Sequence, residues 1–120
     1  MASHHMHRIQ EDISRELTAI LRTVKDPRVS SGMVSILRVD VSNDLSYATV
    51  HITSLGGMEE AKTAVKGLQS AAGYMRKSLG MALKLRHVPE LRFVPDDSIA
   101  YSAHIERTLL SLEKEREQRG

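Results

Sequence analysis

The 120-residue sequence contains no cysteine, no tryptophan and only four aromatic residues, three tyrosines and one phenylalanine. The absence of cysteine excludes disulfide bonds, thiolate zinc sites and cysteine nucleophiles. With so few rings, a folded core has to be built from Ile, Leu, Val, Met and Ala. The same scarcity argues against nucleic-acid modules that stack several bases on aromatic platforms.

Long hydrophobic runs are missing as well. No apolar segment approaches the roughly 20 residues that a bilayer span requires, and no signal-peptide pattern opens the chain. We therefore expect a cytoplasmic protein without a membrane partner. The composition, 41% hydrophobic and 27% charged, is typical of one folded domain rather than of a disordered segment.

Positive charge is small overall but unevenly placed. The chain has 17 basic and 15 acidic residues, a net charge of +2. Residues 61–95 carry seven basic residues against one acidic residue, whereas the segments before and after are net negative. A localised basic stretch is typical of a polyanion-binding surface, although a solvated helix face gives the same pattern.

Hydrophobic periodicity predicts one α+β domain over residues 7–112. The patterns predict a helix over 9–24, strands over 34–41 and 48–53, helical spacing over 61–83, a strand over 91–94 and a helix over 98–112. A change of parity in the first strand predicts a β-bulge near Ile36. We expect residues 1–6 to be a flexible terminus or tag remnant and residues 113–120 to be a charged tail.

One face of the 61–83 segment combines lysines with small residues. At about 100° per residue, a shared arc holds Lys62, Lys66, Ser70, Gly73, Lys77, Gly80 and Lys84. Because glycine has no side chain, a phosphodiester backbone could approach this face while the lysines neutralise phosphates. Solvated lysines beside tightly packed glycines would give the same spacing. The periodicity does not indicate whether the helix is broken at Gly73.

Several motifs together resemble the bacterial ribosome-binding factor A family. They are Lys25-Asp26-Pro27-Arg28, the turn at 42–48, Ser70-Ala71-Ala72-Gly73-Tyr74, the segment 83–93 and Asp96-Asp97-Ser98. The resemblance implies a type II KH-like fold of order α-β-β-α-kink-α-β followed by a C-terminal helix. It places an Ala-x-Gly kink at Ala71-Ala72-Gly73. It also implies a sheet whose first strand is central, antiparallel to the second strand and parallel to the third.

The same resemblance implies a function. Members of the family are non-enzymatic assembly factors that bind the immature small (30S) ribosomal subunit and its 16S rRNA and assist rRNA processing and subunit maturation, notably in the cold. KH domains hold a few single-stranded nucleotides in an aliphatic groove, which agrees with the scarcity of aromatic residues. We expect a monomer without cofactor or metal. The predicted RNA contacts are Lys62, Lys66, Ser70, Ala71, Ala72, Gly73, Arg76, Lys77, Lys84, Arg86 and His87, with Arg28 and Arg38 as secondary contacts.

Two other classes of function are weighed against this one. A protein-interaction domain would use its hairpin and sheet edge to extend a partner's sheet, with no direct RNA role, and would bind regardless of salt or RNase. A small hydrolase built on Asp97 or His104 would lose turnover on Asp97→Asn, but the sequence contains no nucleophile elbow and no P-loop. The N-terminal histidines His4, His5 and His7 have no neighbouring carboxylate that completes a metal site.

Overall fold

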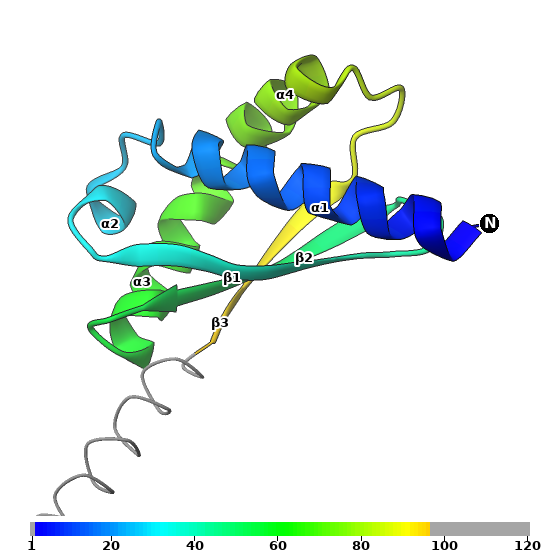
Figure 1. The fold of residues 1–120 in the computed structure, drawn as a ribbon. Coiled ribbons are helices and arrows are strands. Elements are labelled where there is room, and N and C mark those ends of the chain that lie inside the picture. Colours follow the sequence, from blue (N-terminus) through cyan, green and yellow to red (C-terminus); the bar gives the residue numbers. More distant parts are fainter. Residues whose placement is uncertain (1, 97–120) are drawn as a thin grey trace, which may run out of the picture.

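The computed structural model describes residues 2–96 of the chain. Within this range, four helices and three strands follow one another in the order α1–α2–β1–β2–α3–α4–β3 (Figure 1). The element order therefore matches the predicted α+β pattern, except that α2 was not predicted. The predicted helix over 98–112 and the charged tail over 113–120 lie outside the described residues.

The first helix, α1 (Ala2–Leu21), is longer than predicted. It begins at Ala2 rather than near Ile9, so the segment expected to be flexible forms its first turns. No proline or glycine interrupts residues 1–21, and nothing in the sequence forces a later start. One stripe of the helix, which includes Ile13 and Leu17, is completely buried.

A single helical turn, α2 (Pro27–Ser30), follows α1. The carboxylate of Asp26 accepts a hydrogen bond from the backbone N–H of Arg28 at 2.9 Å, and Pro27 occupies the first helical position. A side-chain acceptor before the helix and a proline at its start are the usual signals of a helix N-terminus. The Asp26-Pro27 pair thus starts a helix, whereas α1 already ends at Leu21, three residues earlier than the predicted end at Val24.

Strands β1 (Val34–Val41) and β2 (Tyr47–Ser54) form the predicted antiparallel hairpin. The pairing shifts register between Ile36 and Arg38, which confirms the predicted β-bulge. The bulge reverses which side chains face the helices, so that Ile36 and Val39 both pack against the core.

The implied sheet order was wrong. The strands lie in the order β1-β2-β3, with β2 and not β1 in the centre. Strand β3 (Glu90–Pro95) runs parallel to β2, with Phe93 opposite Val50. The helices between β2 and β3 bring β3 next to β2 and parallel to it, as is usual for a β-α-β connection. Strand β1 is therefore an edge strand.

Helices α1, α3 (Met58–Ser70) and α4 (Ala72–Leu83) cover one face of the sheet (Figure 1). The core between the two layers is aliphatic, as the composition predicted. Its largest fully buried side chains include Ile13, Leu17, Ile52, Leu68, Met75 and Leu79. The opposite face of the sheet carries polar and charged side chains. None of the helices in residues 2–96 is both long and apolar enough to cross a bilayer.

Candidate nucleic-acid interface

The long helical pattern over 61–83 is two helices separated by a break at Ala71. Helix α3 ends at Ser70 and α4 begins at Ala72. The N–H of Ala71 donates to the carbonyl oxygens of Gly67, at 3.1 Å, and Leu68, at 3.0 Å. The predicted kink at Ala71-Ala72-Gly73 is thereby confirmed. Because α3 and α4 are separate helices, the arc calculated for one straight helix does not describe the surface.

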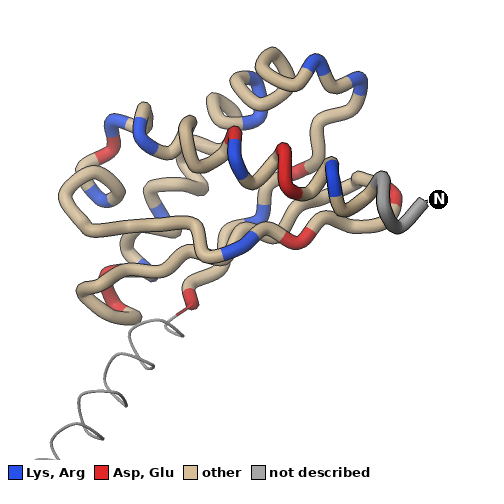
Figure 2. The backbone as a smooth tube through the Cα atoms, in the orientation of Figure 1, with Lys and Arg blue, Asp and Glu red and all other residues tan. Residues whose placement is uncertain are grey.

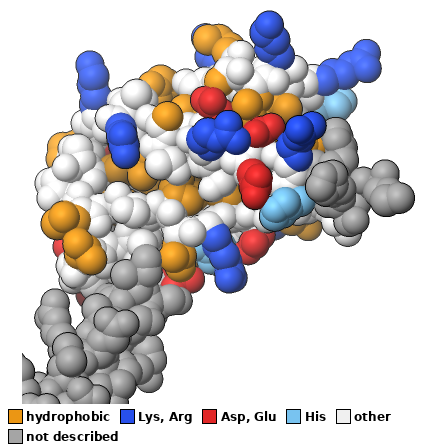
Figure 3. Space-filling view, viewed as in Figure 1, with side chains coloured by type: hydrophobic (Ala, Val, Ile, Leu, Met, Phe, Trp, Pro, Cys, Tyr) orange, Lys and Arg blue, Asp and Glu red, His pale blue; other side chains and the backbone are white. Residues whose placement is uncertain are grey.

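Four of the eight predicted lysine and arginine contacts remain fully available to a ligand. Lys66, Lys77, Lys84 and Arg86 are exposed, and no other residue in the described range holds them in a hydrogen bond or ion pair. Lys62 is exposed too, but its ammonium lies 3.4 Å from Oε1 of Glu59. Figure 2 marks Lys and Arg positions along α4 and the connection after it, and Figure 3 shows basic side chains projecting at that edge. We call Lys66, Lys77, Lys84 and Arg86 the cation rim.

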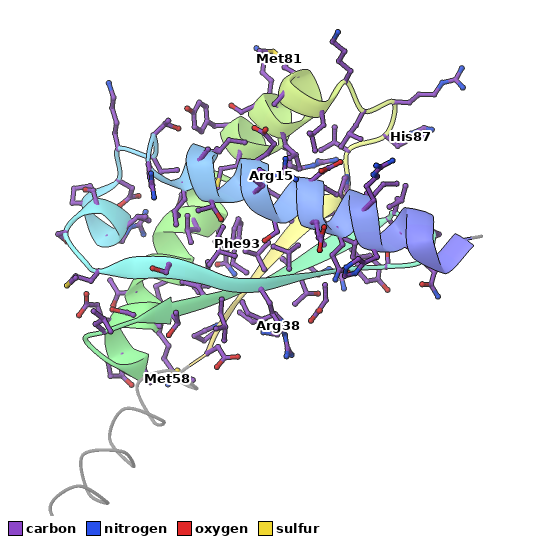
Figure 4. All side chains as sticks on the ribbon, in the orientation of Figure 1. Arg15, Arg38, Met58, Met81, His87 and Phe93 are labelled. Atoms are coloured by element: carbon purple, nitrogen blue, oxygen red, sulfur yellow. The ribbon has the colours of Figure 1, made fainter. Side chains whose placement is uncertain are left out.

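Helix α4 ends at a residue with an unusual backbone conformation. Lys84 adopts a left-handed conformation with φ 53°, and the N–H of Leu85 donates to the carbonyl oxygen of Gly80 at 3.1 Å. This arrangement closes the helix and turns the chain outward into the 84–89 connection. Arg86 and His87 are exposed there, and Figure 4 shows His87 on this connection, away from the core.

Arg76, one of the predicted RNA contacts, is already hydrogen-bonded within the protein. Its Nε donates to the carbonyl oxygen of Pro89 at 3.2 Å, and its Nη2 donates to that of Val88 at 3.0 Å. Two hydrogen bonds from one planar guanidinium fasten the 84–89 connection to α4. The sequence pattern identified the charge of Arg76 and missed these internal partners, which are 12 and 13 residues away in the chain.

Arg28 lies beside the helix break, but its charge is already paired. Its Nη2 lies 2.6 Å from Oδ2 of Asp26 and 3.3 Å from Oγ of Ser70. The hydrogen bonds from the Arg28 side chain and backbone lower the pKa of Asp26 from 3.8 to about 2, and the same partnership raises the pKa of Arg28. Arg28 thus neutralises an acid at the junction more than it adds positive charge.

Arg38 is not brought together with the cation rim. It projects from β1 on the face of the sheet that the helices leave open (Figure 4), and its Nε lies 3.3 Å from Oδ2 of Asp40. On the same face, His51 lies 2.9 Å from that oxygen. The sheet and the helical layer therefore separate Arg38 from α4.

The small residues of the predicted stripe differ in what surrounds them. A Cβ atom added to Gly73 would meet nothing within 4 Å, so this position is open to an approaching ligand. A Cβ atom added to Gly80 would lie 2.7 Å from Cγ2 of Val88. Of the two glycines, only Gly73 offers the close approach that the sequence analysis ascribed to both.

The structure has a groove at the helix break that the sequence did not predict. Its volume is about 490 Å³, and it lies between the connection from α1 to α2 and the junction of α3 and α4. It is lined by Thr23, Val24, Lys25, Asp26, Ser70, Ala71 and Tyr74. Ser70 and Ala71 were predicted contacts, and Tyr74 ends the junction at residues 70–74 where contact was expected, whereas Lys25 was not predicted. Lys25 belongs to a motif that carries the family resemblance, and that was the one available signal.

The alternative chemistries gain no support from residues 2–96. Within them, no group of three His, Asp or Glu side chains is arranged to hold a metal ion. His7 lies 3.0 Å from Oε1 of Glu11, so that histidine does have a carboxylate neighbour. Asp97 and His104, the residues of the hydrolase hypothesis, lie outside the described residues.

Comparisons with known proteins point to one family. A family model described as ribosome-binding factor A matches residues 5–109. A protein named ribosome-binding factor A from Caldanaerobacter subterraneus is 42% identical over 110 residues, covering 91% of this chain and 89% of that protein. A protein of the same name from Brevibacillus brevis is 42% identical over 112 residues, covering 92% and 91%.

Solved structures agree in fold. A Thermotoga maritima protein described as a candidate ribosome binding factor A superposes with a TM-score of 0.66 at 34% identity, covering 73% of this chain and 83% of that one. A Thermus thermophilus homology model, fitted into a cryo-EM map of a complex with the 30S subunit, gives a TM-score of 0.61 at 23% identity, covering 72% and 90%. These neighbours support the KH-like α+β fold.

Proposed function

The chain belongs to the ribosome-binding factor A family, and on that premise we propose that it binds the small ribosomal subunit through its 16S rRNA. The related Thermus thermophilus protein is described in a complex with the 30S subunit. We further propose that this chain assists rRNA processing and subunit maturation in the cytoplasm, acting as a monomer. It performs no chemical step of its own.

The observation that carries the proposal is the cation rim. Lys66 and Lys77 lie on either side of the helix break, Lys84 and Arg86 lie at the far end of α4, and none of the four has a partner within residues 2–96. Gly73, in the first turn of α4, provides an open point of approach next to the break. Unpaired lysine and arginine side chains bind phosphates by neutralising them and releasing counterions, without reading the base sequence.

A protein of this kind acts by binding energy alone. A ligand shifts a conformational equilibrium only by its difference in affinity for the two states. If the chain binds one arrangement of an unfinished rRNA more tightly than another, it increases the population of that arrangement. No cofactor or nucleotide hydrolysis is needed for such a shift.

Co-sedimentation tests the proposal directly. Purified small subunits from cells lacking the protein are mixed with the wild-type chain or with the Lys77→Glu, Lys84→Glu double variant and separated on sucrose gradients. We expect the wild-type chain to co-migrate with the subunits and the double variant to remain at the top. Treating the subunits with RNase and raising the salt concentration should both release the wild-type chain.

The matched control is Arg8→Glu with Arg15→Glu. It makes the same charge change at the same seven-residue spacing on exposed positions of α1, and Arg15 also gives up an exposed ion pair with Asp12. This variant should still co-migrate. If both double variants lose co-migration to the same extent, net charge and not the cation rim is responsible for binding to the subunit. Co-migration that survives salt and RNase would support the sheet-edge protein contact instead.

A further inference from the structure

The groove at the helix break has a lining unlike the rest of the interface. Side chains of Val24, Ala71 and Tyr74 make much of its wall apolar, and Tyr74 is 50% exposed despite its size. Exposed tyrosine rings at a polar surface are typical of contacts with flat, partly apolar groups. The groove volume of about 490 Å³ lies within the range of small-molecule sites, roughly 300–1,000 Å³.

The ring of Tyr74 is held in place by a contact across the groove. Its hydroxyl lies 2.6 Å from Oγ1 of Thr23, which in turn lies 2.7 Å from the carbonyl oxygen of Ile20. Because its hydroxyl is already hydrogen-bonded, the Tyr74 side chain loses little further conformational entropy when a ligand packs against its ring. The ring is thus oriented before any ligand arrives.

The charges around the groove favour an anionic ligand. The one acid in its lining, Asp26, is neutralised by Arg28. Lys25 also lines the groove and has no hydrogen-bond or ion-pair partner in the described range. Two lysines of the cation rim continue its edges, because Lys66 lies one turn before Ser70 and Lys77 three residues after Tyr74. The Tyr74 ring with lysines on several sides is suited to a nucleotide, in which a flat base is attached to anionic phosphates.

We propose that this groove is a base-binding subsite, in which one unpaired base of a single-stranded RNA stacks on the Tyr74 ring while Lys25, Lys66 and Lys77 contact the flanking phosphates. The inference rests on the proposed function, because it takes RNA as the ligand. It adds one aromatic contact to an interface whose scarcity of aromatic residues argues only against stacking several bases. One ring supports one stacked base, whereas several rings are needed for a platform.

Fluorescence anisotropy with a labelled ten-nucleotide polyuridylate tests the subsite. Tyr74→Leu removes the ring and keeps an apolar side chain, so its affinity should fall by roughly five- to a hundredfold, the range found for one stacked base. Tyr74→Phe keeps the ring and should retain most of the affinity. Tyr47→Leu, a matched change at an exposed tyrosine on the open sheet face, should leave the affinity unchanged.

A second probe separates stacking from a change of fold. An abasic chain of the same length has the phosphates without the bases, so wild type and Tyr74→Leu should bind it equally. If Tyr74→Leu matches wild type on polyuridylate, or weakens both probes alike, the subsite is wrong. If the wild-type chain binds the two probes equally, the subsite is also wrong, because the bases then add nothing to the binding of the phosphates.

Crosslinking provides a readout that needs no variant. Single-stranded RNA carrying 4-thiouridine should attach to the wild-type chain at residues 23–26 or 70–77, and attachment confined to the open sheet face would overturn the subsite. Subunit co-sedimentation distinguishes the two proposals. Wild type that fails to co-migrate contradicts the proposed function, whereas co-migration together with Tyr74→Leu behaving as wild type in every assay contradicts the subsite alone.

Discussion

Gly80 packs directly against Val88, so closely that a Cβ atom at position 80 would lie 2.7 Å from Cγ2 of Val88. The contact joins α4 to the connection that leads into β3. Gly73 lies two turns earlier in the same helix and has no neighbour within 4 Å of the corresponding point. The same residue type therefore serves packing at one position and access at the other.

Replacing each of the two glycines by alanine should change the free energy of unfolding in opposite directions. Gly73→Ala should raise the free energy of unfolding by about 0.5–1 kcal/mol, because alanine favours the helix and meets nothing. Gly80→Ala should lower it, because the short branched side chain of Val88 has to move. Thermal or urea unfolding monitored by circular dichroism measures both. Equal effects of the two substitutions would contradict the packing assigned to Gly80.

Arg76 should matter for stability more than its lysine neighbour. Arg76→Ala removes both hydrogen bonds to the 84–89 connection and should cost about 1 kcal/mol. Amide hydrogen exchange in residues 84–89 should become faster. Lys77→Ala, which removes an exposed side chain without a described partner, should change stability by less than about 0.5 kcal/mol. Unchanged exchange in the Arg76 variant would show that the guanidinium does not fasten the connection.

Asp26 should titrate at unusually low pH. Its hydrogen bonds with Arg28 lower its pKa from 3.8 to about 2. Because the folded-state pKa lies below the unfolded value, the ionised carboxylate contributes stability that is present above about pH 4 and lost as the pH falls toward 2. Carbon-13 NMR of the carboxyl group measures this titration directly. A midpoint near 4 in the wild-type chain would contradict the Asp26–Arg28 pairing.

The matched test replaces the guanidinium. Arg28→Ala should return the pKa of Asp26 toward its ordinary value and remove this part of the acid sensitivity. The pKa of Asp44, which hydrogen bonds from Ser46 and Ser42 lower independently, should not change in that variant. Movement of both carboxyls would point to a general change of fold.

The salt dependence of RNA binding should report how many phosphate contacts the cation rim makes. Each contact to a single strand contributes about 0.7 to the slope of log affinity against log salt. Lys77→Gln with Lys84→Gln should therefore reduce the magnitude of that slope by about 1.4. Arg8→Gln with Arg15→Gln should leave it unchanged. The measurement is a salt titration of binding to single-stranded RNA, and an unaltered slope in the first variant would remove these lysines from the interface.

Local patterns in the sequence were enough for most of the elements. Alternating residues predicted the hairpin, and a change of parity located the β-bulge near Ile36, because the side-chain period of a strand depends only on neighbouring positions. The aliphatic core followed from the composition. The family motifs correctly located the helix break around Ala71, which periodicity alone did not reveal.

Contacts between distant segments could not be read in this way. The central place of β2, the pairing of Arg76 with the 84–89 connection and the packing of Gly80 on Val88 each join residues that no local period links. Arg38 was predicted as a secondary RNA contact, and only the structure showed that the sheet separates it from α4. The sequence by itself determined most of the helical and extended segments and the aliphatic core, but not α2 or the early start of α1, because those properties depend on short-range spacing and on transfer from water. Only the tertiary structure decided which charges are free, which are paired and which share a surface, because those outcomes depend on what the fold places within a few ångströms.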